Sequence, residues 1–137
     1  MNSRVQFCEA LLTRLMGLRD ADTGIWSGEL ASSALSTALA AIALAGEDEA
    51  HNRLAADGAA WLVAHANPDG GWGDTSASPS NLSTSLINRA ALRALARRGL
   101  ISGKVCEAVM AQADAWLAAR LKGVATPERI AQALGEV

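Results

Sequence analysis

The sequence contains no tyrosine, one phenylalanine and only 4% aromatic residues, although 50% of its residues are hydrophobic. Alanine and leucine supply most of the apolar surface, which is typical of closely packed helices. The chain also lacks a basic cluster and carries a formal net charge of −2. Nucleic-acid binding needs concentrated lysine and arginine, so we expect no nucleic-acid partner.

Cysteines and long apolar runs are scarce as well. Cys8 and Cys106 belong to no CxxC or Cys/His cluster, and both fall in apolar helical patterns, so we interpret them as reduced core residues of a cytoplasmic protein. The most apolar window, 38–45, is much shorter than the ~20 residues that span a bilayer. No signal-peptide pattern precedes Glu9. We therefore expect a soluble chain without a transmembrane segment, and peripheral membrane contact stays open.

The sequence also lacks the alternation of β-branched and polar residues that predicts strands. Apolar residues recur at helical spacing instead, and Thr126-Pro127-Glu128 combines a capping hydroxyl with proline at the first helical position. Glycines are expected to end several of the helices. The predicted helices cover about 3–19, 32–45, 47–65, 81–98 and 103–121, followed by a short helix over 126–134.

A glycine-rich turn occurs twice in the chain. The clearer copy is Asn67-Pro68-Asp69-Gly70-Gly71-Trp72-Gly73-Asp74, and the weaker copy is Asp22-Thr23-Gly24-Ile25-Trp26-Ser27-Gly28. The two turn tryptophans lie 46 residues apart, and the helical segments 35–39 and 82–86 lie 47 apart. Leu15 and Trp61 each precede their turn tryptophan by eleven residues, so the helix before the turn is repeated too.

A period in the forties is typical of helical-hairpin arrays. A third copy begins at Asp114-Ala115-Trp116 and does not reach a glycine turn of its own. We expect one domain over 1–137 that contains these units. Repeat one covers about 3–46, repeat two about 47–99, an incomplete third repeat about 103–123, and a short terminal helix about 126–134.

The turn has a structural rationale of its own. Glycines can supply the positive φ angles of a tight reversal between helices. Trp72 can cover the turn as a large apolar side chain whose indole N–H needs a carbonyl partner. We therefore interpret the motif residues as structural. They are Asp69, Gly70, Gly71, Trp72, Gly73 and Asp74 in the second copy and Gly24 and Trp26 in the first.

With these residues in view, a family resemblance is plain. Trp61-Leu62, followed by 66–73, resembles the QW-type repeat of the squalene–hopene cyclase and prenyltransferase superfamily, and the likeness extends from about Glu9 to Leu121. The resemblance implies an all-α fold of tandem antiparallel helical hairpins: a partial α/α toroid of about five helices plus a short C-terminal helix. One helix of each hairpin then lines an apolar cavity for an isoprenoid ligand. Cavity-facing candidates are Asn81, Thr84 and Leu86 in the second repeat and Ser36, Thr37 and Leu39 in the first.

The sequence departs from the family pattern both at the glutamine that names the motif and at the residues that would carry the family's chemistry. The glutamine of the QW motif is replaced by Ala66 in the second copy and by Asp20 in the first. Cyclases of this kind protonate an alkene with a DxDD acid, but the nearest string, 20–23, lacks the final aspartate. His51 and His65 have no cysteine or histidine at zinc-ligand spacing. We assign no catalytic residue, metal or cofactor.

Two functional interpretations remain open. In the first, the chain contributes to an apolar isoprenoid-binding cavity and has no turnover in isolation. In the second, it is a non-catalytic helical-repeat module that self-associates or binds a protein partner. Two hairpins and a fraction leave apolar edges that tend to become interfaces, so we expect either a piece of a larger cyclase-like toroid or a small array that buries its open edge by self-association. In isolation the chain is expected to dimerise or oligomerise.

Overall fold

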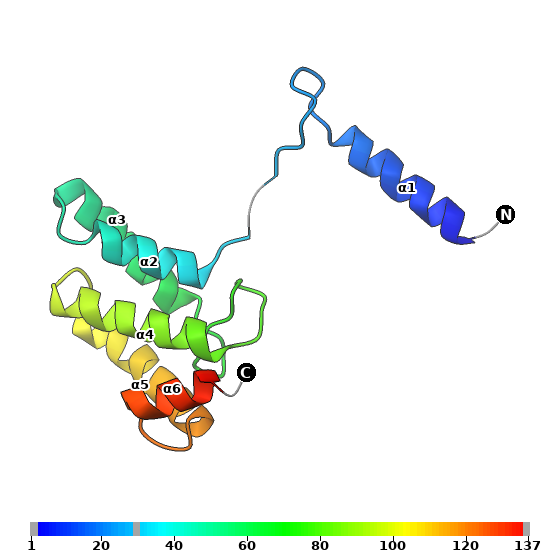
Figure 1. Cartoon of the computed structure of the whole chain (residues 1–137). Coiled ribbons are helices and arrows are strands. Elements are labelled where there is room, and N and C mark those ends of the chain that lie inside the picture. The colour runs from blue at the N-terminus through cyan, green and yellow to red at the C-terminus, as the bar shows by residue number, and fades with distance from the viewer. Residues whose placement is uncertain (1–2, 29–30, 136–137) are drawn as a thin grey trace. The chain divides into compact units, whose positions relative to one another are not determined.

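The computed structural model describes residues 3–28 and 31–135 (Figure 1). Within these ranges the regular elements are all α-helices, so the predicted all-α class is confirmed. The helices are α1 (Ser3–Gly17), α2 (Ala34–Leu44), α3 (Glu49–Ala64), α4 (Leu82–Arg97), α5 (Gly103–Arg120) and α6 (Pro127–Gly135).

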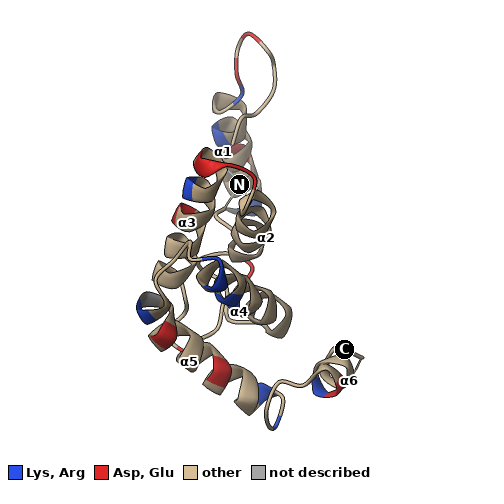
Figure 2. Cartoon of the chain, turned by 90° about the vertical axis from the view of Figure 1, so that its left-hand side faces the viewer, with Lys and Arg blue, Asp and Glu red and all other residues tan. Residues whose placement is uncertain are grey.

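Side-chain caps mark the beginnings of α2, α3 and α4. The side chain of Ser33 accepts a hydrogen bond from the Ser36 amide, which starts α2 two residues after the predicted position. Asp48 does the same for α3, and the neighbouring acidic residues lie at the positive end of that helix dipole (Figure 2). Asn81 caps α4 in the same way, since its side chain accepts a hydrogen bond from the Thr84 amide.

Glycines in the left-handed region follow three helices, as predicted. Gly46 has φ +96°, Gly99 has φ +73° and Gly123 has φ +147°. A side chain at these φ values is strained, so glycine allows the chain to turn directly after α2, α4 and α5. The first helix ends at Gly17, two residues before the predicted Arg19.

The contacts divide the chain into two compact units, Met1–Leu30 and Ala31–Val137. In the second unit α2 packs against both α3 and α4, and α4 packs against α5. This order is that of consecutive helical hairpins. The expected single domain over 1–137 stays a prediction.

Alanine dominates the core of the second unit and lets its helices approach closely. A Cβ placed at Gly58 on α3 would lie 3.2 Å from the Cβ of Ala41 on α2, so even one methyl group would be tight at that crossing. Larger buried side chains come mainly from α3, α4, α5 and the glycine turn. They include Leu62, Trp72, Leu92, Leu95, Cys106, Trp116 and Leu117.

The first unit consists of α1 and the weaker glycine turn. Its apolar side chains are exposed, and Cys8 is exposed with them. The core role predicted for Cys8 is therefore wrong, because a single helix and a turn cannot enclose a core. Cys106 on α5 is buried, as predicted, and this burial raises the pKa of its thiol.

Candidate functional site

The stronger glycine turn connects α3 to α4 and is closed by its own backbone. The Asn67 amide donates to the Gly71 carbonyl at 2.8 Å, and the Gly70 amide donates to the Asn67 carbonyl at 2.9 Å. Gly70 has φ +90°, and a Cβ there would lie 2.7 Å from the backbone carbonyl of Gln112 on α5. Glycine thus serves two needs here: it permits the left-handed turn and lets α5 pass directly beside it.

Trp72 is the buried centre of the turn. Its side chain is fully buried, and its indole Nε1–H donates to the Leu62 carbonyl at 2.9 Å, near the end of α3. Its backbone amide donates to the Ser85 hydroxyl of α4 at 2.9 Å. The predicted indole–carbonyl bond is confirmed, and one residue joins the end of α3 to the first turn of α4.

Asp69 links the turn to the incomplete third repeat. One carboxylate oxygen accepts hydrogen bonds from the Gly71 amide (3.0 Å) and the Ser80 hydroxyl (2.6 Å). The other oxygen accepts from the indole Nε1–H of Trp116 on α5 at 3.0 Å. Partial burial raises the pKa of Asp69, but these three hydrogen bonds and the positive charge of Arg120 outweigh it, so the pKa lies below its usual value.

Asp74 holds the other side of the turn. One of its oxygens accepts from the Thr84 hydroxyl and from the Asn81 side-chain amide, both at 2.7 Å. These two bonds lower the pKa of Asp74 against a weaker opposing effect of burial. Asn81 therefore caps α4 with its oxygen and braces Asp74 with its nitrogen.

The weaker turn has the same indole–carbonyl hydrogen bond as the stronger turn, but its tryptophan is not buried. The Trp26 indole Nε1–H donates to the Leu15 carbonyl at 2.6 Å, yet the side chain remains 47% exposed. Gly24 has φ +71°, and the guanidinium of Arg19 lies over the Trp26 ring at 5.6 Å. The string 20–23 forms an exposed turn, in which Asp20 accepts from the amide and hydroxyl of Thr23.

The predicted cavity-facing residues fall into different environments. Thr84 is buried and Asn81 is half-buried, and both bond to Asp74. Leu86 and Thr37 are half-buried, whereas Ser36 and Leu39 are exposed on α2. The cavity-facing role of all six stays a prediction, although Asn81 and Thr84 are already engaged in bracing the turn.

A shallow pocket of about 470 Å³ lies beside the turn. Asn67, Pro68 and Asp69 form one side, and the segment 76–80 and Arg120 form the rest. The only carboxylate in this lining is that of Asp69, which accepts hydrogen bonds on both oxygens and has a lowered pKa. A group in that state holds neighbouring elements together and has no proton to give near neutral pH.

Two partners in this site were not foreseen from the sequence. Trp116 was recognised as the start of a third repeat, but its bond to Asp69 joins residues 47 positions apart and has no local signal. The hydroxyl of Ser85 bonds the backbone of Trp72, whereas in the sequence Ser85 is only one residue of the repeated helical segment 82–86. The histidines lie apart from this site: His65 stacks on Trp61 at 4.0 Å, and His51 pairs with Asp48 at the start of α3.

Repeated helical hairpins joined by tryptophan-centred glycine turns define the class of protein, an α-helical repeat protein. A comparison with models of protein families matches the squalene-hopene cyclase N-terminal domain over residues 10–130. Because this match covers most of the sequence, the chain belongs to the squalene-hopene cyclase N-terminal domain family, which confirms the resemblance found in the glycine turns. No curated protein and no solved structure matches the chain.

Within residues 3–28 and 31–135, no group of three histidine, cysteine, aspartate or glutamate side chains is placed to hold a metal ion. None of the helices described is both long and apolar enough to cross a membrane.

Proposed function

We propose that this chain supplies helical hairpins to a terpene-cyclase-like assembly, in which its exposed apolar helix faces are covered by a second copy and contribute to an isoprenoid-binding cavity. The assembly itself, and not an isolated chain, forms the binding cavity. The observation that carries this proposal is the exposure of large apolar side chains on α1 and α2.

The first exposed face belongs to α1. Its large apolar residues are between 50% and 66% exposed, which is far more than a soluble helix leaves open without a partner. These residues are Val5, Phe7, Leu11, Leu12, Leu15 and Met16, with Leu18 just after the helix. Covering them with a second copy removes this apolar area from water and favours association.

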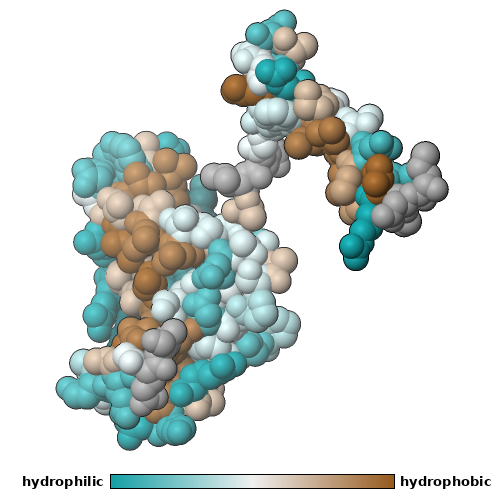
Figure 3. Space-filling view, turned by 45° about the vertical axis from the view of Figure 1, so that its right-hand side comes forward, coloured by the Kyte–Doolittle hydropathy of each residue, from teal (hydrophilic) through white to brown (hydrophobic). Residues whose placement is uncertain are grey.

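The second exposed face lies within residues 31–135, where apolar side chains gather on the surface (Figure 3). Leu39 on α2 is 53% exposed and Leu54 on α3 is 56% exposed, and Ile42 adds to this surface. Leu39 and the exposed Ser36 are two of the predicted cavity-facing residues. Their exposure supports a cavity that closes only when further helices cover α2.

The oligomeric state tests the association. Light scattering at micromolar concentration should give at least a dimer, and Leu12→Glu on α1 should shift the mass toward the monomer. Gln6→Glu is the matched control, since it adds the same charge to an exposed polar position of α1. A monomeric mass for the unmodified chain would refute the proposal.

Ligand binding tests the cavity. Squalene in detergent micelles should quench or shift the tryptophan fluorescence of the assembled chain, and Leu39→Glu should remove this response. Ala40→Glu, at an exposed neighbouring position of α2, should retain it.

A second candidate function is a non-catalytic helical-repeat module that only binds a protein partner. The observation that favours it is α1 itself, since an exposed amphipathic helix outside the main unit is suited to packing against another protein. An oligomer that does not respond to squalene would favour this second function over the first.

A further inference from the structure

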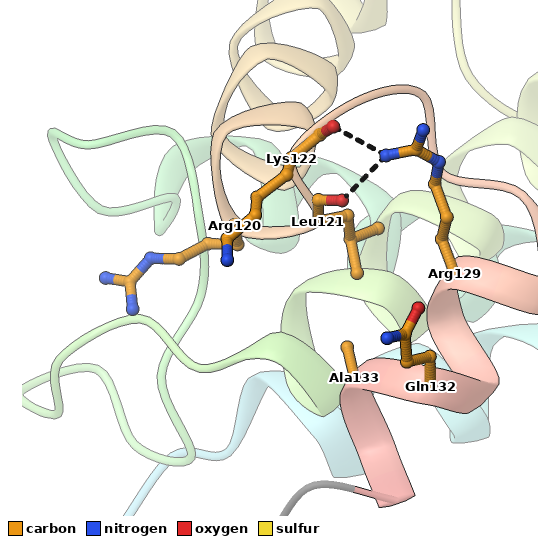
Figure 4. Close-up of a pocket in the computed structure, with 6 residues that line it drawn as sticks. All are labelled: Arg120, Leu121, Lys122, Arg129, Gln132 and Ala133. Atoms are coloured by element: carbon orange, nitrogen blue, oxygen red, sulfur yellow. Dashed lines mark hydrogen bonds between the residues drawn. The ribbon is translucent and has the colours of Figure 1, made fainter.

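A basic pocket lies between the end of α5 and α6 (Figure 4). Its volume is about 340 Å³. It is lined by Arg120, Leu121, Lys122, Arg129, Gln132 and Ala133. Three of these six side chains are basic and none is acidic, although the chain as a whole carries a net charge of −2. Figure 2 shows basic residues at the end of α5 and in the loop that follows it, and both basic and acidic residues at the start of α6, where Glu128 lies in the first turn.

Arg129 joins the two walls of the pocket. Its Nη1 donates to the Leu121 carbonyl at 3.1 Å and to the Lys122 carbonyl at 2.5 Å. These carbonyls follow α5, where the helix dipole is negative and would otherwise repel an anion. Because a guanidinium carries five N–H donors, this arrangement offsets the negative helix end and still leaves donors on the exposed Arg129 side chain.

The backbone places the Lys122 carbonyl next to this guanidinium. Lys122 has φ +53°, a left-handed conformation that is uncommon for residues other than glycine, and Gly123 follows it with φ +147°. The chain therefore reverses directly after α5 and returns to α6. In Figure 4 the Lys122 carbonyl faces the Arg129 guanidinium, and the Lys122 side chain extends away from it toward Arg120, so the two cations lie on different sides of the pocket.

The neighbouring acidic groups are engaged elsewhere. Hydrogen bonds from its own backbone amide and from the Thr126 hydroxyl lower the pKa of Glu128, which places its carboxylate at the start of α6. Asp69 interacts with the charge of Arg120, and the Arg120 guanidinium lies over the Trp116 ring at 4.9 Å. Arg120 is thus shared with the glycine turn, and Lys122 and Arg129 are the cations available to a ligand.

We propose that this pocket binds a phosphate or diphosphate group, held by the Lys122 ammonium and the Arg129 guanidinium. Charge-assisted hydrogen bonds from lysine and arginine are the usual way in which proteins recognise phosphate oxygens. The inference depends on the α5–α6 pocket alone and is independent of self-association and of isoprenoid binding.

Calorimetric titration of the full chain with inorganic pyrophosphate at low ionic strength tests the site. Lys122→Gln should weaken binding about tenfold, as expected for the loss of one charge-assisted contact. The matched control is Lys104→Gln, which removes an exposed lysine at the other end of α5 and should leave the affinity within about twofold. Circular dichroism checks that both variants keep the helical content of the unmodified chain.

Vesicles distinguish a soluble phosphate from a lipid headgroup. Sedimentation with phosphatidylglycerol vesicles that depends on Lys122, together with absence of binding to phosphatidylcholine, would identify an anionic lipid headgroup as the source. Pyrophosphate binding that depends on Lys122, without vesicle binding, would identify a soluble ligand. The proposal is overturned if neither probe binds, or if Lys122→Gln and Lys104→Gln weaken binding equally.

Discussion

Replacement of Trp72 by alanine is the most direct test of the glycine turn as a structural element. Trp72 is fully buried, and its indole N–H bonds the Leu62 carbonyl. Its backbone also bonds the Ser85 hydroxyl, which the substitution leaves in place. The change therefore removes a large buried side chain and one buried hydrogen bond while the backbone connections of the turn remain.

The expected cost is about 3–5 kcal/mol of unfolding free energy, the usual range for truncating a buried aromatic side chain. The estimate agrees with burial of an indole side chain at about 25 cal/mol per Å². The lost indole–carbonyl bond accounts for about 1 kcal/mol of this cost. Because domains are stable by only about 5–15 kcal/mol, Trp72→Ala should remove much of the stability of residues 31–135.

Urea unfolding followed by circular dichroism at 222 nm measures the effect. Trp26→Ala is an internal control, since Trp26 makes the equivalent bond to the Leu15 carbonyl but is 47% exposed. We expect this control to change the unfolding free energy by less than about 1 kcal/mol. A Trp72→Ala variant as stable as the Trp26→Ala variant would show that the indole does not hold α3 to α4.

Two further substitutions test the turn. Gly73→Ala should lower the unfolding free energy measured in urea by about 1–3 kcal/mol, because the added Cβ would collide with the Ser78 carbonyl and lie 2.7 Å from the Pro79 carbonyl. Gly103→Ala is the control, since no atom lies within 4 Å of its added Cβ and its unfolding free energy should not fall. An equal loss of unfolding free energy in both variants would contradict the explanation. Asp69 has a pKa lowered from 3.8, so its ionised form contributes stability above that pH, and the contribution is lost as pH falls through the folded pKa. Asp69→Asn should be less stable near neutral pH and lose less stability on acidification, and parallel pH profiles of the two proteins would refute the role of Asp69.

The helices and their ends could be predicted because their signals are local. Ser33 and Asn81 each cap the amide three residues ahead, and Gly46, Gly99 and Gly123 adopt the left-handed conformation directly after a helix. The bond from Trp72 to the Leu62 carbonyl spans ten residues and also follows from the turn itself. In each case the interacting groups lie within one hairpin, so the sequence contains both partners close together.

The contacts between hairpins could not be predicted in the same way. The Trp116 indole bonds Asp69 across 47 residues, and this pairing depends on how α5 passes the turn. Asn88 on α4 is fully buried, and no described group bonds its side-chain amide atoms. Its polar side chain would predict an exposed or hydrogen-bonded position instead. Cys8 shows the opposite error: an amphipathic pattern identifies the apolar face of α1, but it does not identify what covers that face.

Comparison of the two glycine turns distinguishes what the turn sequence determines from what the packing of adjacent helices determines. Both tryptophans bond a carbonyl of the preceding helix, and the two acceptors, Leu15 and Leu62, lie 47 residues apart, the same spacing as the helices that follow. The bond is therefore a property of the turn sequence. Burial is different, because Trp72 is enclosed where α4 and α5 pack around its turn while Trp26 has no such cover within residues 3–28. A repeat of this kind gains its core from neighbouring hairpins. The glycine turn therefore specifies where the chain reverses, and packing of the adjacent repeat determines how stable that hairpin is.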